Sequence, residues 1–111
     1  MDIIFSSKKQ EKTFNTKRLL EKEYGENARL IMRRMNVLRA ASTLADVPHL
    51  KPERCHQLTG NRKGEFAVDL KHPHRLTFKP NHYPVPKDKD GGTALNMITA
   101  IKILKVEDYH K

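Results

Sequence analysis

The chain has 111 residues, of which 22 are lysine or arginine and 13 are aspartate or glutamate, and its formal net charge at pH 7 is +9. This length predicts one domain with a single core over residues 1–111, and the positive charge favours nucleic acid or an acidic protein as partner. No apolar run reaches the roughly 18 residues of a membrane span, the start lacks the positive charge of a signal peptide, and the single Cys55 excludes an internal disulfide, so we expect a cytoplasmic protein without a membrane partner.

The first half of the chain predicts one strand followed by two helices. Residues 2–6 form a short apolar run that is typical of a strand. Residues 8–25 are mostly good helix formers and finish on Gly25, which can close a helix. Residues 26–47 carry apolar side chains at helical spacing, and Pro48 ends that helix. The arginines of this second helix could grip phosphate, meet an acidic partner or lie on a solvated face: Arg29, Arg33, Arg34 and Arg39.

From residue 54 onward the apolar residues alternate with polar ones, which is the period of strands. Candidate strands cover residues 54–58, 65–71 and 75–79. A turn with glycine at both ends joins the first two, and a His-Pro-His turn joins the next two. Because these connections are short, we expect the strands to pair in antiparallel fashion.

A loop and a final strand complete the chain. Residues 80–96 are rich in proline and glycine and predict a long, mobile loop. Residues 98–109 are strongly apolar and predict a strand, but the alternation changes between Ile103 and Leu104. A β-bulge at that point would keep both halves of the strand in register with the sheet.

This order of elements predicts an α+β fold. The N-terminal strand and two helices would be followed by about four antiparallel strands, with the helices on one face of the sheet. The opposite face would carry His56, Lys71, Arg75 and Lys79, which makes it the candidate functional surface.

Two stretches resemble a known protein family. One contains a His-x-Leu strand, a Gly-Asn-Arg-x-Gly turn and a His-Arg-Leu-x-Phe strand, and the other is Asp-Tyr-His near the end. Together they resemble the RelE/ParE superfamily of bacterial toxins, and within it the HigB branch of plasmid-maintenance killer proteins. The predicted order of elements is also that of this family, and the resemblance covers the chain except residues 80–96. The matching positions are His56, Leu58, Gly60, Asn61, Arg62, Gly64, His74, Arg75, Leu76, Phe78, Asp108, Tyr109 and His110.

The resemblance implies the toxin of a type II toxin–antitoxin pair. Such a toxin is an endoribonuclease that cuts mRNA in the ribosomal A site, which inhibits translation and arrests growth. Its partners would be mRNA, ribosomal RNA and a small helix-turn-helix antitoxin of the HigA type. The resemblance implies no metal and no small-molecule cofactor.

Metal-free RNA cleavage needs a base for the ribose 2′-hydroxyl, cations for the phosphorane and an acid for the departing 5′-oxygen. The resemblance makes His56 and His110 the acid and base, in either order, because an imidazole with an ordinary pKa of about 6.5 can serve as both. Arg75 and Arg62 would hold the phosphorane, since a guanidinium fits phosphate oxygens. The other candidates are Asp108 to orient a histidine or act as base, Tyr109 to stack on a base or hold phosphate, and Lys63, Lys71 and Lys79 to bind the RNA backbone.

Structural explanations compete with some of these roles. His56 would otherwise be a half-buried strand histidine, and Arg75 would pair with Asp69 or Glu65 across the hairpin. Thr59 stands where HigB-type toxins often carry lysine, so that a neighbouring cation, Arg62 or Lys63, would have to supply the missing charge.

A metal site and a thiol nucleophile are disfavoured. His72, His74 and His82 lack the spacing and the further ligands of a zinc site. Cys55 neighbours His56 in a strand, so the two side chains point to opposite faces and Cys55 belongs to the core.

Two other functions compete with the ribonuclease. One is a non-catalytic toxin of the ParE kind that poisons DNA gyrase, which would not need the histidines. The other is a basic module that binds nucleic acid or an acidic protein without cutting, with strongly salt-dependent affinity.

Overall fold

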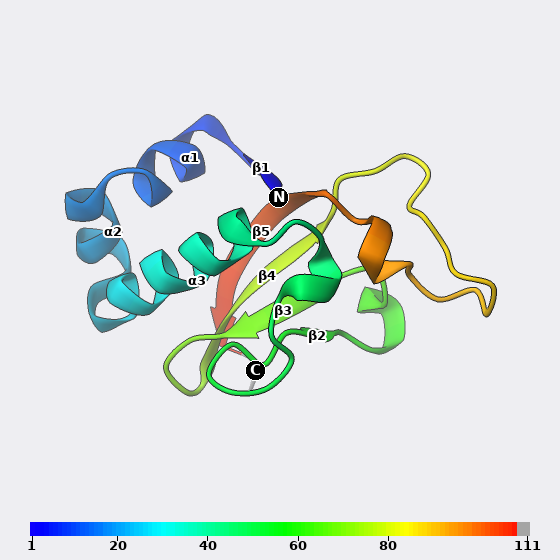
Figure 1. The fold of residues 1–111 in the computed structure, drawn as a ribbon. Coiled ribbons are helices and arrows are strands. Elements are labelled where there is room, and N and C mark those ends of the chain that lie inside the picture. Colours follow the sequence, from blue (N-terminus) through cyan, green and yellow to red (C-terminus); the bar gives the residue numbers. More distant parts are fainter. Residues whose placement is uncertain (109–111) are drawn as a thin grey trace.

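The computed structural model describes residues 1–108 (Figure 1). Along these residues strand β1 (Asp2–Phe5) precedes three helices, α1 (Lys8–Phe14), α2 (Lys17–Tyr24) and α3 (Ala28–Ala40). Four strands follow, β2 (His56–Gln57), β3 (Phe66–Asp69), β4 (His74–Pro80) and β5 (Ala100–Asp108). The connections contain short 3-10 helices, η1 (Gly25–Asn27), η2 (Leu44–Asp46), η3 (Gly60–Arg62) and η4 (Leu95–Met97). None of the described helices is long and apolar enough to cross a bilayer.

The strands form one mixed sheet in the order β1-β5-β4-β3-β2. β1 runs parallel to β5, and every other neighbouring pair is antiparallel. Figure 1 shows the three helices gathered on one side of this sheet. The predicted α+β architecture, with its N-terminal strand and its antiparallel block, is therefore confirmed.

The first predicted helix, residues 8–25, is in fact two helices. α1 ends at Phe14 and α2 begins at Lys17, with Thr16 in an extended conformation between them. Asparagine and threonine have a lower helix propensity than the residues around them, which favours a break at Asn15 and Thr16. The break lets both short helices turn a weak apolar stripe inward, and it brings the Phe14 ring within 5.9 Å of the Tyr24 ring.

The second predicted helix is shorter than expected. α3 ends at Ala40 rather than next to Pro48. The Asp46 carboxylate accepts hydrogen bonds from the backbone N–H and the hydroxyl of Thr43, and this capping box starts the separate turn η2. The predicted strands 54–58 and 65–71 also shorten, to β2 and β3.

The predicted β-bulge is present in β5. Thr77 lies opposite Lys105 and Phe78 lies opposite Ile103, so Leu104 is the additional residue. Without it, Ile103 and Val106 could not both face the helices, because side chains alternate along a strand.

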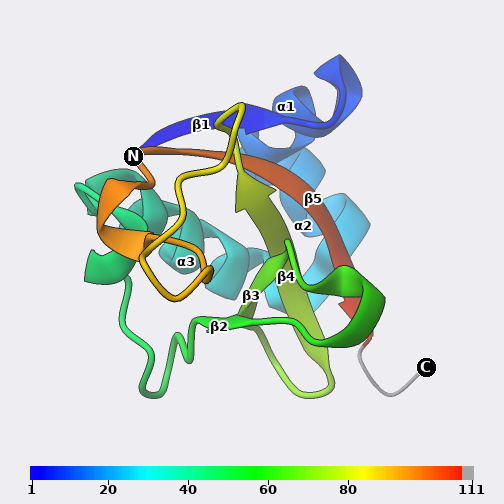
Figure 2. The ribbon, with the colours of Figure 1, turned by 90° about the vertical axis from the view of Figure 1, so that its right-hand side faces the viewer.

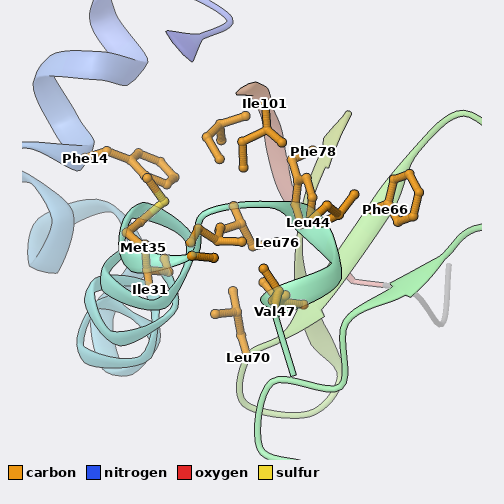
Figure 3. Close-up of a cluster of buried hydrophobic side chains, with 14 of the residues drawn as sticks. Phe14, Ile31, Met35, Leu44, Val47, Phe66, Leu70, Leu76, Phe78 and Ile101 are labelled. Atoms are coloured by element: carbon orange, nitrogen blue, oxygen red, sulfur yellow. The ribbon is translucent and has the colours of Figure 1, made fainter. Parts of the chain in front are cut away.

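The core lies between α3 and the sheet (Figure 3). Ile31, Met35 and Leu38 of α3 have at most 2% of their surface exposed, as their helical spacing predicted. Buried side chains of the sheet complete this core, among them Phe66 and Phe78, which lie opposite each other in β3 and β4. The sheet face turned away from the helices is called the outer face below. By register it carries His56, Ala67, Thr77, Arg75, Lys79, Lys102, Lys105 and Glu107.

The long connection between β4 and β5 folds back on itself (Figure 2). Lys87 and Thr93 form an isolated antiparallel bridge, and the Asp88 carboxylate accepts hydrogen bonds from the backbone N–H groups of Asp90 and Gly92. Both glycines of the Gly-Gly pair thus serve a tight turn, with Gly91 at a φ of +85°. The expected loop is present, and its mobility stays a prediction.

Candidate functional site

A cleft of about 240 Å³ opens on the outer face. Its lining combines part of β2, the turn η3 and one residue of β4: His56, Gln57, Leu58, Thr59, Arg62 and Arg75. The fold thus brings together three residues that the sequence singled out for chemistry, His56, Arg62 and Arg75. They come from separate segments, and the pairing of β2, β3 and β4 makes them neighbours.

His56 is held in a defined orientation. It lies in β2 opposite Ala67, and its Nδ1 is 2.7 Å from the backbone carbonyl oxygen of Arg54. Because a carbonyl oxygen can only accept, Nδ1 carries a proton and donates it there. The Nε2 atom is therefore the one that can exchange a proton with a ligand.

The backbone that orients His56 is itself fixed. Arg54 has a φ of +45°, in the left-handed region that is uncommon for residues other than glycine. Its Nε and Nη2 donate to the two carboxylate oxygens of Asp69 at 2.7 and 2.9 Å. This two-point contact between Arg54, two residues before β2, and the end of β3 explains how the unusual conformation is tolerated.

Beside His56 lies a group that we call the arginine–glutamate cluster, made of Arg62, Glu65, Arg75 and Glu107. Arg62 donates from Nη1 and Nη2 to the Glu107 carboxylate at 2.7 and 2.8 Å. Arg75 donates from Nε and Nη2 to Oε2 of Glu107 at 3.0 and 2.7 Å. Arg62 also donates to Glu65, at 2.7 Å from Nη2. One carboxylate thus receives both guanidinium groups that were predicted to hold a phosphorane.

These contacts shift the ionisation of the cluster. The pKa of the Glu107 carboxyl falls from 4.5 to about 2, first because Arg62 donates hydrogen bonds to it and further because Arg75 does, while burial opposes the fall. The same contact with Glu107, followed by that with Glu65, raises the pKa of the Arg62 guanidinium. At neutral pH two cations therefore face two anions, and the local field is much weaker than two bare arginines would produce.

No motif in the sequence indicates a role for Glu65 or Glu107, and the partner expected for Arg75, as an alternative to phosphate, was Asp69 or Glu65 across the hairpin. The observed partner is Glu107, while Arg54 holds the Asp69 carboxylate and Arg62 holds Glu65. The register of β4 against β5 would have identified Glu107 as a partner, because Arg75 lies directly opposite it in this pair.

The predicted lysines have different surroundings. Lys79 lies on the outer face opposite Lys102. Lys63 directly follows η3, and its backbone carbonyl accepts a hydrogen bond from the Gln57 side chain.

The expectation that Lys71 lies on the outer face is wrong. Lys71 lies in the β3–β4 turn, and its ammonium is 2.8 Å from Glu26 at the end of the helical layer. Its backbone N–H also donates to the side chain of Asn27, so the turn is anchored on the helix side.

The terminal candidates are only partly described. Asp108 lies opposite His74 at the end of β5. Alternation along the strand puts it on the face turned toward the helices, one position after Glu107 on the outer face. Tyr109 and His110 lie outside the described residues, so the expected convergence of His110 with His56 stays a prediction.

A second hollow, of about 370 Å³, lies on the other side of β2 and shares His56 and Gln57 with the cleft. Cys55 lines it, and burial raises the pKa of the Cys55 thiol from 9.0 to about 11. A thiol with so little thiolate is a poor nucleophile, which fits the core position expected for it. Among residues 1–108, no three His, Cys, Asp or Glu side chains gather where they could hold a metal ion.

Comparison with known proteins identifies the type of fold. No protein-family profile matches the chain, and no curated protein resembles it in sequence. Among solved structures, a YoeB/ParE toxin from Agrobacterium tumefaciens superposes with a TM-score of 0.53, over 97% of this chain and 98% of that chain, at 10% sequence identity. The chain therefore has the fold of the RelE/ParE-type toxins. At this identity the similarity establishes the fold alone.

Proposed function

We propose that the chain is the toxin of a type II toxin–antitoxin pair and that it cleaves mRNA on the ribosome, as a member of the HigB branch. The observation that carries this proposal is the cleft in which His56, with its Nδ1–H donated to a backbone carbonyl, faces Arg62 and Arg75. The RelE/ParE-type fold and the HigB-like motifs support the same function. The partner would be a helix-turn-helix antitoxin of the HigA type.

The chemistry follows from the cleft. A scissile phosphate in it would meet guanidinium groups that stabilise the dianionic phosphorane. The Nε2 atom of His56 would take the 2′-hydroxyl proton or give a proton to the 5′-oxygen, and His110 would perform the other step. Tyr109 would stack on a base or hold the phosphate. Lys63 and Lys79 would bind the RNA backbone.

The decisive experiment is expression without an antitoxin, with transcripts mapped in the presence and absence of translation. We expect growth arrest and cuts only in mRNA that is being translated. His56→Ala should lower the cleavage rate by about 10²–10⁴-fold, the usual contribution of general acid–base catalysis, while the far-UV circular dichroism is unchanged.

His49→Ala is the matched control, because His49 is an exposed histidine in the segment between η2 and β2. It should retain the cleavage rate of the wild type. If the His56→Ala variant cuts as fast as this control, the role of His56 is wrong.

One observation favours a second candidate, a non-catalytic toxin of the ParE kind that acts on DNA gyrase. Glu107 and Glu65 already neutralise the two arginines of the cleft, which weakens them as ligands of a phosphate. This alternative predicts a DNA-damage response with intact mRNA, and the His56→Ala variant would remain toxic.

A further inference from the structure

Glu107 binds two arginine side chains at once, unlike a carboxylate that is simply exposed at the surface. Both carboxylate oxygens accept from guanidinium groups, and only 13% of its side-chain surface is exposed. Lys105 adds a longer contact, at 3.9 Å from Oε1. Two-point contacts between guanidinium and carboxylate fix orientation as well as distance. Glu107 therefore sets the direction in which Arg62 and Arg75 point.

The same contacts fasten together three segments that are far apart in sequence. Arg62 belongs to η3, Arg75 to β4 and Glu107 to the last part of β5. Figure 2 shows the segment from β2 to η3 lying beside the end of β5, as the contact between Arg62 and Glu107 requires. The cluster thus connects η3, which lines the cleft, to the last part of β5.

We propose that Glu107 is a positioning residue for RNA cleavage. It aligns Arg62 and Arg75 beside His56, and it links η3 and β4 to the last part of β5. This inference rests on the proposed function and adds to it a residue that the motifs do not include.

Glu65 provides a matched control for the charge. Its carboxylate also accepts from Arg62, and 28% of its side-chain surface is exposed. Its contact is local, three residues from Arg62 in the same turn, and does not reach β5. Glu65→Gln and Glu107→Gln thus remove the same charge from the same arginine, and only the second breaks the link between η3, β4 and the end of β5.

The experiment is single-turnover cleavage of mRNA on programmed ribosomes, measured with wild type, Glu107→Gln, Glu107→Asp and Glu65→Gln. We expect Glu107→Gln to lower the cleavage rate roughly 100-fold, because small misplacements of catalytic groups have effects of that size. The concentration of toxin that half-saturates the ribosomes should stay the same or fall, since a negative charge is lost. Glu65→Gln should change the rate less than about threefold, and Glu107→Asp should recover part of the loss, since it restores the carboxylate.

Three results would overturn the inference. They are a Glu107→Gln rate within threefold of the wild type, an equal loss in Glu65→Gln, or a loss in ribosome affinity with an unchanged rate at saturation. Thermal melting of each variant shows whether the assay temperature lies below its transition. If Glu107→Gln does not fold, Glu107→Asp decides alone, and its rate must then fall by at least tenfold while it remains folded.

The outcome for the wild type separates this inference from the proposed function. A wild-type chain that cuts no mRNA rejects the ribonuclease function, and with it any catalytic role of Glu107. A wild-type chain that cuts, together with an unimpaired Glu107→Gln variant, rejects only the positioning role.

Discussion

Two regions of the molecule contain arginines bound to acceptors on other elements, and they differ in what surrounds them. On α3, Arg34 is 5% exposed, donates from Nε to the backbone carbonyl of Asp69 at 2.6 Å and lies 3.9 Å from the Glu53 carboxylate. In the arginine–glutamate cluster, 30% of the Arg62 side chain is exposed and the cleft of His56 lies alongside. The first arginine joins helix to sheet, and the second can reach a ligand.

The comparison shows that residue type alone does not separate structural from functional arginines. The sequence leaves Arg34 as one of several helix arginines that could grip phosphate, yet its guanidinium is enclosed between α3 and β3. A buried charge whose partner is removed is strongly destabilising, whereas a partly exposed ion pair contributes little to stability. We therefore expect substitution of Arg34 to change mainly the free energy of unfolding, and substitution of Arg62 to change mainly the cleavage rate.

Arg34→Ala should have the largest effect on stability. It leaves the Asp69 carbonyl without this donor and Glu53 without a nearby cation, so we expect a loss of about 3–5 kcal/mol in the free energy of unfolding. Denaturant unfolding measures it. Arg33→Ala, at the exposed neighbouring position, is the control and should change the free energy by no more than about 0.5 kcal/mol. A loss below 1 kcal/mol for Arg34→Ala would contradict the structural role.

Acid should weaken the fold through Glu107. The pKa of Glu107 is lowered in the folded chain, from 4.5 to about 2, so its contribution to stability is complete above about pH 4.5 and is lost as the pH falls toward 2. The full contribution is on the order of 2–3 kcal/mol. The free energy of unfolding measured between pH 6 and pH 2 should thus fall less steeply in Glu107→Gln than in the wild type. Parallel curves for the two proteins would show that the ion pairs do not stabilise the fold.

Arg62→Ala should reverse the pattern of Arg34→Ala. Since Arg62 is partly exposed and Arg75 still binds Glu107 in this variant, its loss should change the free energy of unfolding by about 1–2 kcal/mol, less than the loss of Arg34. The cleavage rate should fall by about 10²-fold, as for the loss of one group that stabilises the transition state. Unfolding and cleavage measured on the same preparation provide the comparison. If the Arg62→Ala variant is strongly destabilised but cleaves RNA at the normal rate, Arg62 has a structural role and the proposed contrast with Arg34 is wrong.

The smallest effects are expected from the lysines. Lys79→Ala should reduce the affinity for RNA and lower the slope of log affinity against log salt by about 1, as for one phosphate contact. Lys71→Ala should leave that slope unchanged and cost at most about 1 kcal/mol of stability, because its ammonium pairs with Glu26 on the helix side. Filter binding of a short RNA at several salt concentrations distinguishes them. Equal slopes for the two variants would mean that RNA does not follow the outer face.

Periodic and local features of the fold were predictable from sequence. The spacing of Ile31, Met35 and Leu38 identified the buried side of α3, and the change in alternation at Leu104 identified the bulge. These predictions succeed because each depends on neighbours within a few residues. The helix break at Asn15 and the early end of α3 at Ala40 were missed, because Asn15 and Thr16, and the capping box of Thr43 and Asp46, interrupt stretches whose other residues favour helix.

The candidate site was less predictable, because it depends on pairing between distant segments. The short turn between β3 and β4 fixes their register, which makes Asp69 and Arg75 opposite neighbours. The connection between β4 and β5 is long, so no count of residues gives the register that places Glu107 opposite Arg75. His56 and the two arginines were found through motifs, whereas the carboxylate that binds both arginines was not.

The inner position of β5 has a consequence for the newly made protein. β5 is the last of the five strands to be synthesised, yet it lies between β1 and β4. The sheet therefore cannot close until β5 has left the exit tunnel, and a chain arrested before that point lacks the strand that joins β1 to β4. Nascent chains arrested before residue 100 should be digested by protease at β1, whereas released chains should be protected there.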